Sequence, residues 1–437
     1  MDFVHTHLHT QFSNYGMLDA ISSIDGIINR VYELGQKGFA ITDHNGTGGL
    51  VEAYVNLEKF NKKHNSNLKL LLGSELYYTN DVTVKEKNLY HILFLAKNNK
   101  GLENLYHLVS EAHQHFYYKS RCDLDMIRKY SEGLICTSAC MGGWLRNPNY
   151  VGIAKELKEI FGDDLYLEVH TYQHKDQLEF NQKVMRLADE LNIKTIACCD
   201  SHYIKPEDYE LHKQIRKAFS KVKEKHKDDL AQSEDKYYQT NDFYIMSVGE
   251  VQQKLSYLPK DFVDRSIANT NEIFDKCNVT IEFGQHLYPK FAKDGKAKEM
   301  FLDELRKGYK DKIFGKVHGN YKKLVDERIL HEIDILEKVD YFDYLLITKD
   351  IWDNAKRMGI PTGHGRGSIS NCECAYLLGL TTLDSITNNL YFERFANPNR
   401  ISPADVDLDV SQARRREVID TSKRNTAMCI NAELLTI

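Results

Sequence analysis

Short apolar runs recur through the first half of the chain, separated by polar segments with a different spacing. Seven of these runs are rich in Val, Ile and Leu, and they cover residues 3–4, 38–41, 68–72, 92–96, 134–136, 165–169 and 195–198. Between several of them, apolar residues recur at helical spacing, as in residues 24–34, where Gly35 and Gly38 end the predicted helix. Alternating strands and helices predict an α/β fold with a parallel sheet, and seven strands favour a closed barrel.

Side chains that can bind metal ions follow most of the predicted strands. These side chains are the histidines of residues 5–9 and then Asp19, followed by Asp43-His44, Glu75, Cys140 and Asp200-Ser201-His202. The carboxyl ends of the strands form the mouth of a parallel barrel, so we expect these groups to converge there. Imidazole, carboxylate and one thiolate suit Zn²⁺, with Mn²⁺ or iron possible, and their number predicts two or three ions.

Each of these histidines has a simpler interpretation when it is taken alone. A single histidine on a strand is more often a packed core residue than a ligand, whereas so many after successive strands are hard to explain by packing. His7 and His9 share one face of their strand, and His5 lies on the same face nearer the floor, where it is interpreted as a packing residue. His91 precedes its apolar run, so strand order supports it less. Two further histidines after the sixth strand remain possible ligands or substrate contacts: His170 and His174.

The second half of the chain has a different pattern. Residues 212–227 carry many lysines and Arg216, and we interpret them as an exposed helix and loop, with a solvated face favoured over a nucleic-acid patch. An amphipathic helix is predicted over 347–358, closed by Gly359, and a second helix over 369–378. Between them lies a glycine-rich turn that ends in Gly365-Arg366-Gly367-Ser368. Free backbone N–H groups at a helix start, with the donors of Arg366 and Ser368, predict a triphosphate site.

A row of alternating carboxylates comes next, at Asp405, Asp407 and Asp409. On a strand these three side chains share one side, and such close like charges are costly unless a divalent cation lies between them. Carboxylates that bind two Mg²⁺ ions are what nucleotidyl transfer requires. The alternative is an exposed acidic strand or a calcium-type loop.

Composition limits the remaining possibilities. The chain has 437 residues, of which 42% are hydrophobic and 28% charged, as expected for two or three ordinary globular domains. No apolar run is long enough to span a bilayer, and the first residues lack the features of a signal peptide, so we expect a cytoplasmic protein. Nine irregularly spaced cysteines favour free thiols. A net charge of −5 argues against a surface that binds nucleic acid everywhere, but it leaves room for a local basic groove.

The motifs of the first half resemble those of the polymerase and histidinol phosphatase (PHP) superfamily. The resemblance rests on His7-Leu8-His9, Thr42-Asp43-His44, Gly73-Ser74-Glu75, His91, Cys140 and Asp200-Ser201-His202. It implies a distorted seven-stranded barrel with three metal ions, although the stretch before Asp19 is longer than in the family. The ligands that the resemblance implies are His7, His9, Asp19, His44, Glu75, His91, Cys140, Asp200 and His202.

The second half resembles the palm of the C-family bacterial replicative DNA polymerases, the polymerase III alpha-subunit family. The matching residues are 365–368, 375–376, 392–395, 397–398, 403–409 and 415–420. The resemblance implies that Gly365, Arg366, Gly367 and Ser368 hold the incoming triphosphate. It also implies that Asp407 and Asp409 bind catalytic Mg²⁺, with Asp405 in support. Four residues beside the turn depart from the family pattern: His364, Asn371, Cys372 and Glu373.

Together these features predict a PHP-type distorted (β/α) barrel followed by a partial α+β, nucleotidyltransferase-like palm. We expect the barrel at 1–210, a helical connection at 211–290, the first half of the palm at 291–420 and a divergent tail at 421–437. The implied partners are a DNA primer-template, dNTPs, and the remaining polymerase segments or other replisome subunits.

The predicted function is the amino-terminal portion of a replicative DNA polymerase whose barrel acts as a 3′–5′ exonuclease. A third catalytic Asp of the family has no counterpart in these residues, so we expect that the chain alone does not extend a primer. The alternatives are a stand-alone metal-dependent phosphoesterase and a purely structural barrel in a split polymerase.

Overall fold

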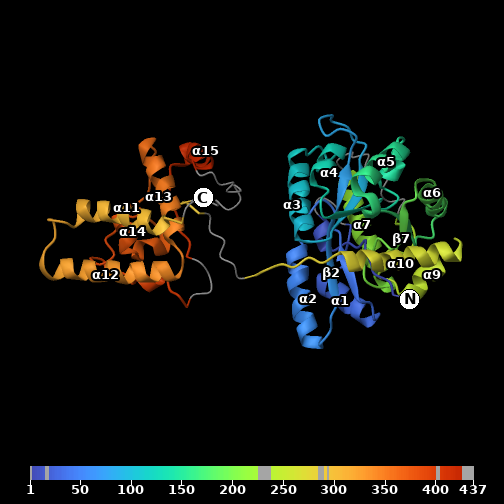
Figure 1. Ribbon diagram of the computed structural model, residues 1–437, viewed down its shortest axis with the longest axis horizontal. Helices are drawn as coiled ribbons and strands as arrows, with labels where there is room; N and C mark the ends of the chain where they lie inside the picture. Colours follow the sequence, from blue (N-terminus) through green and yellow to red (C-terminus); the bar gives the residue numbers. More distant parts are fainter. Residues whose placement is uncertain are drawn as a thin grey trace. The chain divides into compact units, whose positions relative to one another are not determined.

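A computed structural model of the chain describes residues 2–14, 19–224, 238–283, 290–292, 295–399 and 404–425. The chain divides into two compact units, Met1–Glu282 and Phe283–Ile437 (Figure 1). This division lies within the predicted connection 211–290, parts of which, like residues 426–437 of the predicted tail, lie outside the described residues. Among the described helices, none combines the length and apolar character that crossing a lipid bilayer requires.

The first unit is built around one curled, mixed sheet. Its strands follow the order β1 (Gly38–Ile41), β2 (Lys69–Tyr78), β3 (Tyr90–Ala96), β5 (Leu134–Thr137), β6 (Leu165–His170) and β7 (Lys194–Cys198), with β4 (Arg121–Cys122) beside β2. Six of the seven predicted runs lie in these strands, all but residues 3–4, and the α/β barrel-type fold is confirmed. The expectation of a wholly parallel sheet is wrong, because β3 runs antiparallel to both β2 and β5.

The amino-terminal segment joins the two edges of this sheet. His5 forms a parallel bridge with Phe39 of β1, and Leu8 forms one with Ser201, just after β7. The N–H of Thr42 donates to the carbonyl of Leu8 at 3.0 Å, and the N–H of His9 donates to the carbonyl of Ser201 at 2.9 Å. The predicted first strand is therefore a pair of isolated bridges that close the barrel.

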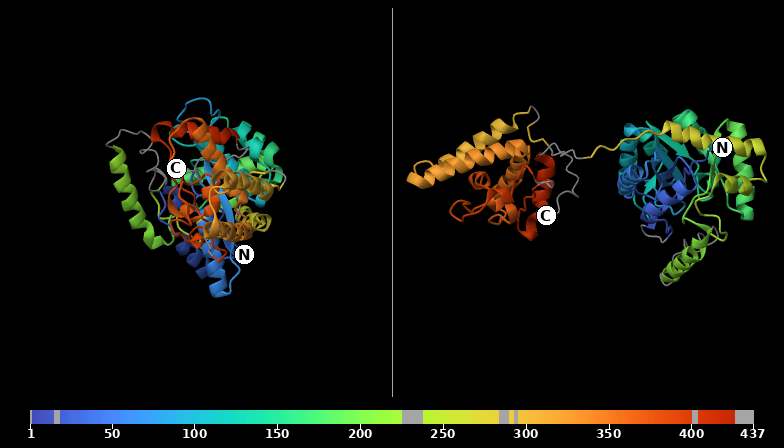
Figure 2. Two further views of the ribbon diagram at one scale, coloured as in Figure 1. Left: turned by 90° about the vertical axis from the view of Figure 1, so that its left-hand side faces the viewer. Right: turned by 90° about the horizontal axis from the view of Figure 1, so that it is seen from below.

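Amphipathic helices cover the sheet. They are α1 (Ile24–Glu33), α2 (Leu50–His64), α3 (Asn99–Gln114), α4 (Leu124–Tyr130), α5 (Tyr150–Phe161), α6 (Lys175–Leu191), α7 (Tyr209–Glu224), α9 (Val248–Lys254) and α10 (Lys260–Lys276). In α1 the Ser23 side chain accepts from the N–H of Gly26, and the predicted apolar face is buried against the core. Figure 2 shows α7 standing out from the rest of the unit.

The second unit is mainly helical among the described residues. Its helices are α11 (Ala297–Lys312), α12 (Gly319–Lys338), α13 (Phe342–Arg357), α14 (Glu373–Leu377) and α15 (Arg415–Asn425). Its core contains Phe301, Leu336, Trp352, Phe392 and Phe395, which are almost fully buried. The predicted helix over 347–358 forms most of α13.

The α-helix predicted over residues 369–378 begins later in the structure than predicted. The chain forms a 3₁₀ helix at Gly367–Asn371, and α14 begins only at Glu373. The cause is the buried carboxylate of Glu332, which accepts from the N–H groups of Glu373 at 2.9 Å and Cys374 at 2.8 Å. Arg328 pairs with the same carboxylate at 2.7 Å. A carboxylate from α12 thus caps the first N–H groups of α14 and fixes where this helix begins.

The aspartate segment of the second unit is extended. Arg366 forms an antiparallel bridge with Asp407, and Thr362 forms one with Val410; strand pairing in the described part of this unit is limited to these two bridges. The N–H of Gly363 donates to the carbonyl of Asp409 at 2.8 Å. The apolar side chains that alternate with and follow the aspartates pack against the core: Val406, Leu408 and Val410.

One buried acid of this unit predicts a pH-dependent stability. Burial raises the pKa of Glu373 from 4.5 to about 7, although Ser385 donates to it from its hydroxyl at 2.7 Å. Because the folded pKa is the higher one, this carboxyl stabilises the fold at low pH, and that contribution is lost as the pH rises from 4.5 to about 7. The free energy of unfolding of the native chain should therefore fall by at most about 3 kcal/mol between pH 5 and pH 8, and Glu373→Gln should abolish this fall.

Fluorescence-detected unfolding can measure this change, because the chain has two tryptophans and Trp352 is the one in the second unit. A Trp144→Phe background leaves Trp352 as the reporter. An unchanged pH dependence in Glu373→Gln would show that this group does not titrate in that range.

Candidate functional site

A single buried carboxylate lies at the centre of the barrel mouth. Glu75 is 1% exposed, and its Oε1 lies 3.0 Å from His91 Nδ1 and 3.5 Å from His7 Nε2. Its Oε2 lies 2.8 Å from His44 Nδ1 and 3.6 Å from His9 Nε2. Glu75 therefore contacts histidines from three different parts of the sheet.

Two aspartates complete this arrangement on either side. Asp200 Oδ1 lies 3.2 Å from His7 Nε2 and 3.1 Å from His9 Nε2. Asp19 Oδ2 lies 3.1 Å from His44 Nε2 and 3.3 Å from His202 Nε2.

The thiol of Cys140 lies 3.3 Å from His91 Nδ1, at the edge of the same cluster. All nine predicted ligands thus come together, and we call this group the candidate metal centre: His7, His9, Asp19, His44, Glu75, His91, Cys140, Asp200 and His202.

The direction of β3 explains the position of His91. This residue lies at the start of its strand, which in a parallel barrel would place it at the closed end. Because β3 is antiparallel to β2, its first residues lie beside the last residues of β2, and His91 pairs with Tyr77 in the sheet register. The sequence rule that made His91 doubtful therefore fails here for a structural reason.

The donor set of the centre fits divalent cations. Four buried ligand atoms make close ion-pair contacts but no hydrogen bond of regular geometry among the described residues: both carboxylate oxygens of Glu75, Oδ1 of Asp200 and Nδ1 of His44. Burial of such atoms is costly unless another group satisfies them. Side chains with ligand atoms within 4.8 Å of one another include the sets His9-His44-His202, His7-His9-Glu75 and His44-Glu75-His91. Nitrogen, oxygen and one sulfur donor suit Zn²⁺ or Mn²⁺.

The pKa values of the histidines differ sharply within the centre. Burial and the neighbouring His44 and His202 lower the pKa of His9 to about 3, so His9 is neutral and able to act as a ligand. Burial would also lower the pKa of His44, but the charges of Glu75 and Asp19 outweigh it and raise that pKa to about 10. A bound cation would have to replace the proton of His44, so metal binding here should release protons.

Sequence reasoning missed a carboxylate beneath the centre, which lies beside His170, one of the two further histidines it had named. Glu168 is fully buried on β6, and its Oε2 accepts from His7 Nδ1 at 2.7 Å. His170 Nε2 lies 3.2 Å from the same oxygen. A carboxylate within an apolar strand, two residues before a histidine, was the available signal. By holding His7 Nδ1, Glu168 leaves His7 Nε2 to face the other ligands.

A second relay orients His9 from the other side. Ser13 Oγ lies 2.9 Å from His9 Nδ1 and donates to Asp43 Oδ1 at 2.6 Å. Asp43 also accepts from the N–H of Thr10 at 2.7 Å, so it fixes the loop that carries Ser13. Asp43 therefore supports the candidate metal centre from outside it.

The interpretation of residues 212–227 as a solvated face is wrong for two of them. His212 is buried and donates to the carbonyl of Asp19 at 2.6 Å. Arg216 pairs with the Asp19 carboxylate and stacks 3.8 Å from the Tyr238 ring centroid, while the Tyr238 hydroxyl lies 2.9 Å from His202 Nε2. Residues 225–227 lie outside the described part of the chain.

Two other histidines lie outside the centre. His5 Nε2 donates to the carbonyl of Met246 at 3.0 Å, and burial lowers the pKa of His5 to about 4. It is a packed core residue, as interpreted from the sequence. His174 precedes α6 and accepts from the N–H of Asp176.

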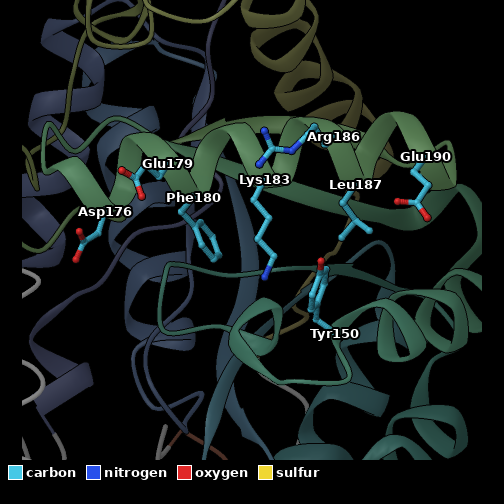
Figure 3. A pocket seen from close by; sticks show the side chains of 8 residues that line it. All are labelled: Tyr150, Asp176, Glu179, Phe180, Lys183, Arg186, Leu187 and Glu190. Atoms are coloured by element: carbon cyan, nitrogen blue, oxygen red, sulfur yellow. The ribbon is translucent and has the colours of Figure 1, made fainter.

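A polar hollow of the first unit lies between α5 and α6 (Figure 3). Lys183 in its wall donates to the carbonyl of Leu145 at 2.8 Å and lies 3.6 Å from the Tyr150 ring centroid. The charge of Lys183 is therefore already engaged. The nine residues of the candidate metal centre do not line this hollow.

The second candidate site, in the other unit, is open and charged. Arg366 lies 3.3 Å from Asp407 Oδ1 and 3.4 Å from Asp409 Oδ1, and all three side chains are at least 40% exposed. The Ser368 hydroxyl lies 3.5 Å from the carbonyl of Asp405. The structure thus brings the glycine turn and the carboxylate row together.

The turn itself requires glycine. Gly365 and Gly367 have φ values of 95° and 75°, and a Cβ at Gly365 would lie 2.6 Å from Thr381 Oγ1. The turn leads into a five-residue 3₁₀ helix, so the predicted α-helical start after it is wrong. Glu373 is buried against Ser385 and accepts from it, so its charge is directed into the core.

Comparisons with known proteins agree with this division of the chain. Residues 5–172 match the family model described as PHP domain, and residues 300–428 match the one described as bacterial DNA polymerase III alpha NTPase domain. The DNA polymerase III subunit alpha of Aquifex aeolicus is 32% identical over 450 residues, which cover 96% of this chain and 37% of that protein. That of Helicobacter pylori is 32% identical, with 96% and 36% covered. The chain therefore spans little more than a third of these relatives.

Among solved structures, a protein from Bifidobacterium adolescentis assigned as a metal-dependent phosphoesterase aligns with a TM-score of 0.34 and 15% identity. The alignment covers 46% of this chain and 88% of that one.

The buried pair of His7 and Glu168 predicts a large stability effect. Glu168→Ala leaves His7 and His170 without their buried carboxylate, so unfolding of the first unit should become easier by about 3 kcal/mol. Chemical unfolding in EDTA, followed through Trp144 in a Trp352→Phe background, measures this change. The matched control is Glu156→Ala, because Glu156 is 48% exposed and pairs with Arg128 at 2.7 Å. The control should change stability by less than about 1 kcal/mol, and equal effects would contradict a structural role for Glu168.

Proposed function

Since the chain carries the PHP domain and the NTPase domain of the DNA polymerase III alpha family, we propose that it is part of a replicative DNA polymerase with a metal-dependent phosphoesterase centre. The proposed reaction of the barrel is 3′–5′ hydrolysis of DNA ends. The observation that supports it most is the convergence of nine ligand residues at the barrel mouth, several of them with ligand atoms within 4.8 Å of one another. Gathering so many ionisable side chains in a buried site is costly for a purely structural barrel, whereas a metal centre would use all of them.

The nine residues would divide among two or three ions. Glu75 is placed to be shared, since its two oxygens face different histidines. Zn²⁺ or Mn²⁺ is the proposed occupant. Divalent ions bound there supply Lewis acidity and charge neutralisation for hydrolysis of a phosphate ester.

The protein's own groups would hold these ligands in place. Glu168 fixes the tautomer of His7, and Ser13 with Asp43 fixes the ring of His9. Arg216 pairs with Asp19 and stacks on Tyr238, so it would hold Asp19 in place at the edge of the centre. Tyr172 donates to Asp200 Oδ2 at 2.5 Å and leaves Oδ1 to face His7 and His9.

The second unit would contribute to nucleotidyl transfer in the complete polymerase, with a DNA primer-template and dNTPs as substrates. Asp407 and Asp409 would bind Mg²⁺, and Asp405 would support them. The turn at Gly365-Arg366-Gly367-Ser368 would hold the triphosphate. Arg366 pairs with both aspartates in this structure, and its guanidinium is the group of the turn that would bind phosphate oxygens while the aspartates hold Mg²⁺.

Metal content is the first test of this proposal. The purified chain should carry about two or three ions of Zn, Mn or Fe, measured by elemental analysis. His9→Ala or Asp200→Ala should lower the metal content and the melting temperature, because metal binding contributes to folding free energy. His331→Ala is the control, since His331 lies exposed in the second unit and pairs with Glu393. Less than about half an equivalent of these metals in the native chain would favour the structural barrel.

Hydrolysis of a labelled single-stranded oligonucleotide is the second test. The native chain should shorten it slowly from the 3′ end with Zn²⁺ or Mn²⁺, and EDTA should stop the reaction. His44→Ala should lower the rate at least about 100-fold, which is the usual effect of losing a group needed in the transition state. Asp407→Ala should retain the native rate, because the other unit carries that residue. If His44→Ala degrades DNA as fast as the native chain, the activity does not come from the barrel.

A further inference from the structure

Two large aromatic side chains stand exposed on the loop after α3. Phe116 is 61% exposed and Tyr118 is 43% exposed. Tyr118 has a φ of 63°, which is uncommon for a bulky residue, and the N–H of Tyr117 donates to the carbonyl of Lys119 at 2.9 Å across it. The chain thus holds an aromatic ring at the tip of a strained turn without burying it. Strain of this kind is more common at binding sites than in ordinary loops.

A buried arginine connects this loop to a second one. Arg121 is 3% exposed, and its guanidinium donates to three backbone carbonyls. One belongs to His115, at 3.0 Å, and the others belong to Val84 and Val82 of the loop after β2, at 2.6 and 2.8 Å. The two loops therefore form one preorganised surface. We call it the rim platform and define it by Lys85, Lys87, Phe116, Tyr118 and Lys119.

Positive charges alternate with the rings of the rim platform. Lys85 and Lys87 are exposed, and the Lys87 ammonium lies 4.7 Å from the Tyr118 ring centroid. The two acids of the same loop are directed to its hydroxyl groups. Asp81 accepts from Thr83, and Glu86 accepts from Thr79, both at 2.7 Å. Asp81 stays exposed and Glu86 is half-buried, so the three lysines of the rim platform give this surface a small excess of positive charge beside its exposed rings.

The rim platform begins where the candidate metal centre ends. Lys119 lies 5.4 Å from the ring centroid of Tyr77, and that ring contacts His91 edge-on at 4.9 Å and stacks against His44 at 6.1 Å. His113, at the end of α3, donates to the carbonyl of Asn45 at 3.0 Å and so ties the loop to the neighbour of His44. A strand lying on the platform would have its end beside the ligands.

We propose that the rim platform binds single-stranded nucleic acid and leads its end into the candidate metal centre. Phe116 and Tyr118 stack on successive bases, while Lys85, Lys87 and Lys119 contact the phosphates. Alternating aromatic and cationic groups are how proteins bind single strands without reading sequence. A protein partner fits less well, because lysine is depleted in protein interfaces. As a route for substrate, the platform rests on the proposed phosphoesterase function, whereas its affinity for single strands does not.

Fluorescence anisotropy tests the proposal with a labelled oligothymidine of about ten nucleotides and the full chain in EDTA, so that no hydrolysis occurs. Phe116→Ala and Tyr118→Asn should each raise Kd about fivefold or more. Asparagine tolerates the left-handed backbone at 118, so that variant should fold, and Tyr118→Phe should restore near-native affinity. Lys87→Gln should lower the dependence of log K on log salt by about 0.7. The matched control is Phe314→Ala, since Phe314 is 67% exposed in the second unit and should not matter.

The outcomes separate the rim platform from the catalytic proposal. The platform would be overturned if both aromatic variants bound the oligothymidine with the native Kd, or if Phe314→Ala raised Kd as much as they do. The native chain could also bind a blunt duplex as tightly as the oligothymidine, with the same loss of affinity in Phe116→Ala and Tyr118→Asn. That result would overturn the preference of the platform for single strands. If the native chain hydrolyses nothing with any metal, but the aromatic variants still lose affinity in EDTA, the phosphoesterase proposal fails and the platform stands.

Discussion

The first unit depends on how the charge of Glu75 is neutralised at the mouth of the barrel. Burial alone would raise the pKa of this carboxyl, but the charges of His91, His44 and His7 hold that pKa well below its usual range. These histidines come from the amino-terminal segment, from the loop after β1 and from the reversed strand β3. A fold that buries an ionised carboxylate must bring its counter-charges with it. The packing of three separate segments is therefore tied to one side chain, and the relays through Glu168 and Ser13 keep its partners oriented.

The second unit places its charges differently. Its buried carboxylates cap or pair within the core, as Glu332 does with Arg328 and the start of α14. The carboxylates of the proposed Mg²⁺ site stay exposed, with Arg366 between two of them. An exposed ion pair contributes little to stability, so its partners can exchange easily. The two sites of the chain thus differ in kind: one is rigid and preformed, and the other can rearrange when a charged substrate arrives.

Much of the fold and of the candidate metal centre could be predicted from the sequence, because strands and ligands leave local signals. The apolar runs marked most of the strands, and residues that follow them gave much of the candidate centre, while the full set of nine candidate ligands came from the resemblance to the PHP superfamily. What failed depends on contacts between distant segments. The reversal of β3 has no local signature, and the break before Glu373 comes from Glu332, some forty residues earlier. Arg216 and His212 lie on a helix with a charged composition, and only the tertiary fold turns them toward Asp19. Glu168 was hidden by the apolar strand around it.

The closure of the sheet by residues 5–8 has a consequence for synthesis of the protein. These residues leave the ribosome long before their neighbours at Ser201, and His5 and Val4 must further wait for Met246 and Thr270, which bind their ring and backbone. At ordinary translation rates this delay is on the order of tens of seconds. Until Ser201 has been made, the segment with His7 and His9 can pair only with residues at and beside β1, such as Phe39 and Thr42. The barrel can therefore close only after most of the first unit has been synthesised, so residues 5–8 complete their contacts late.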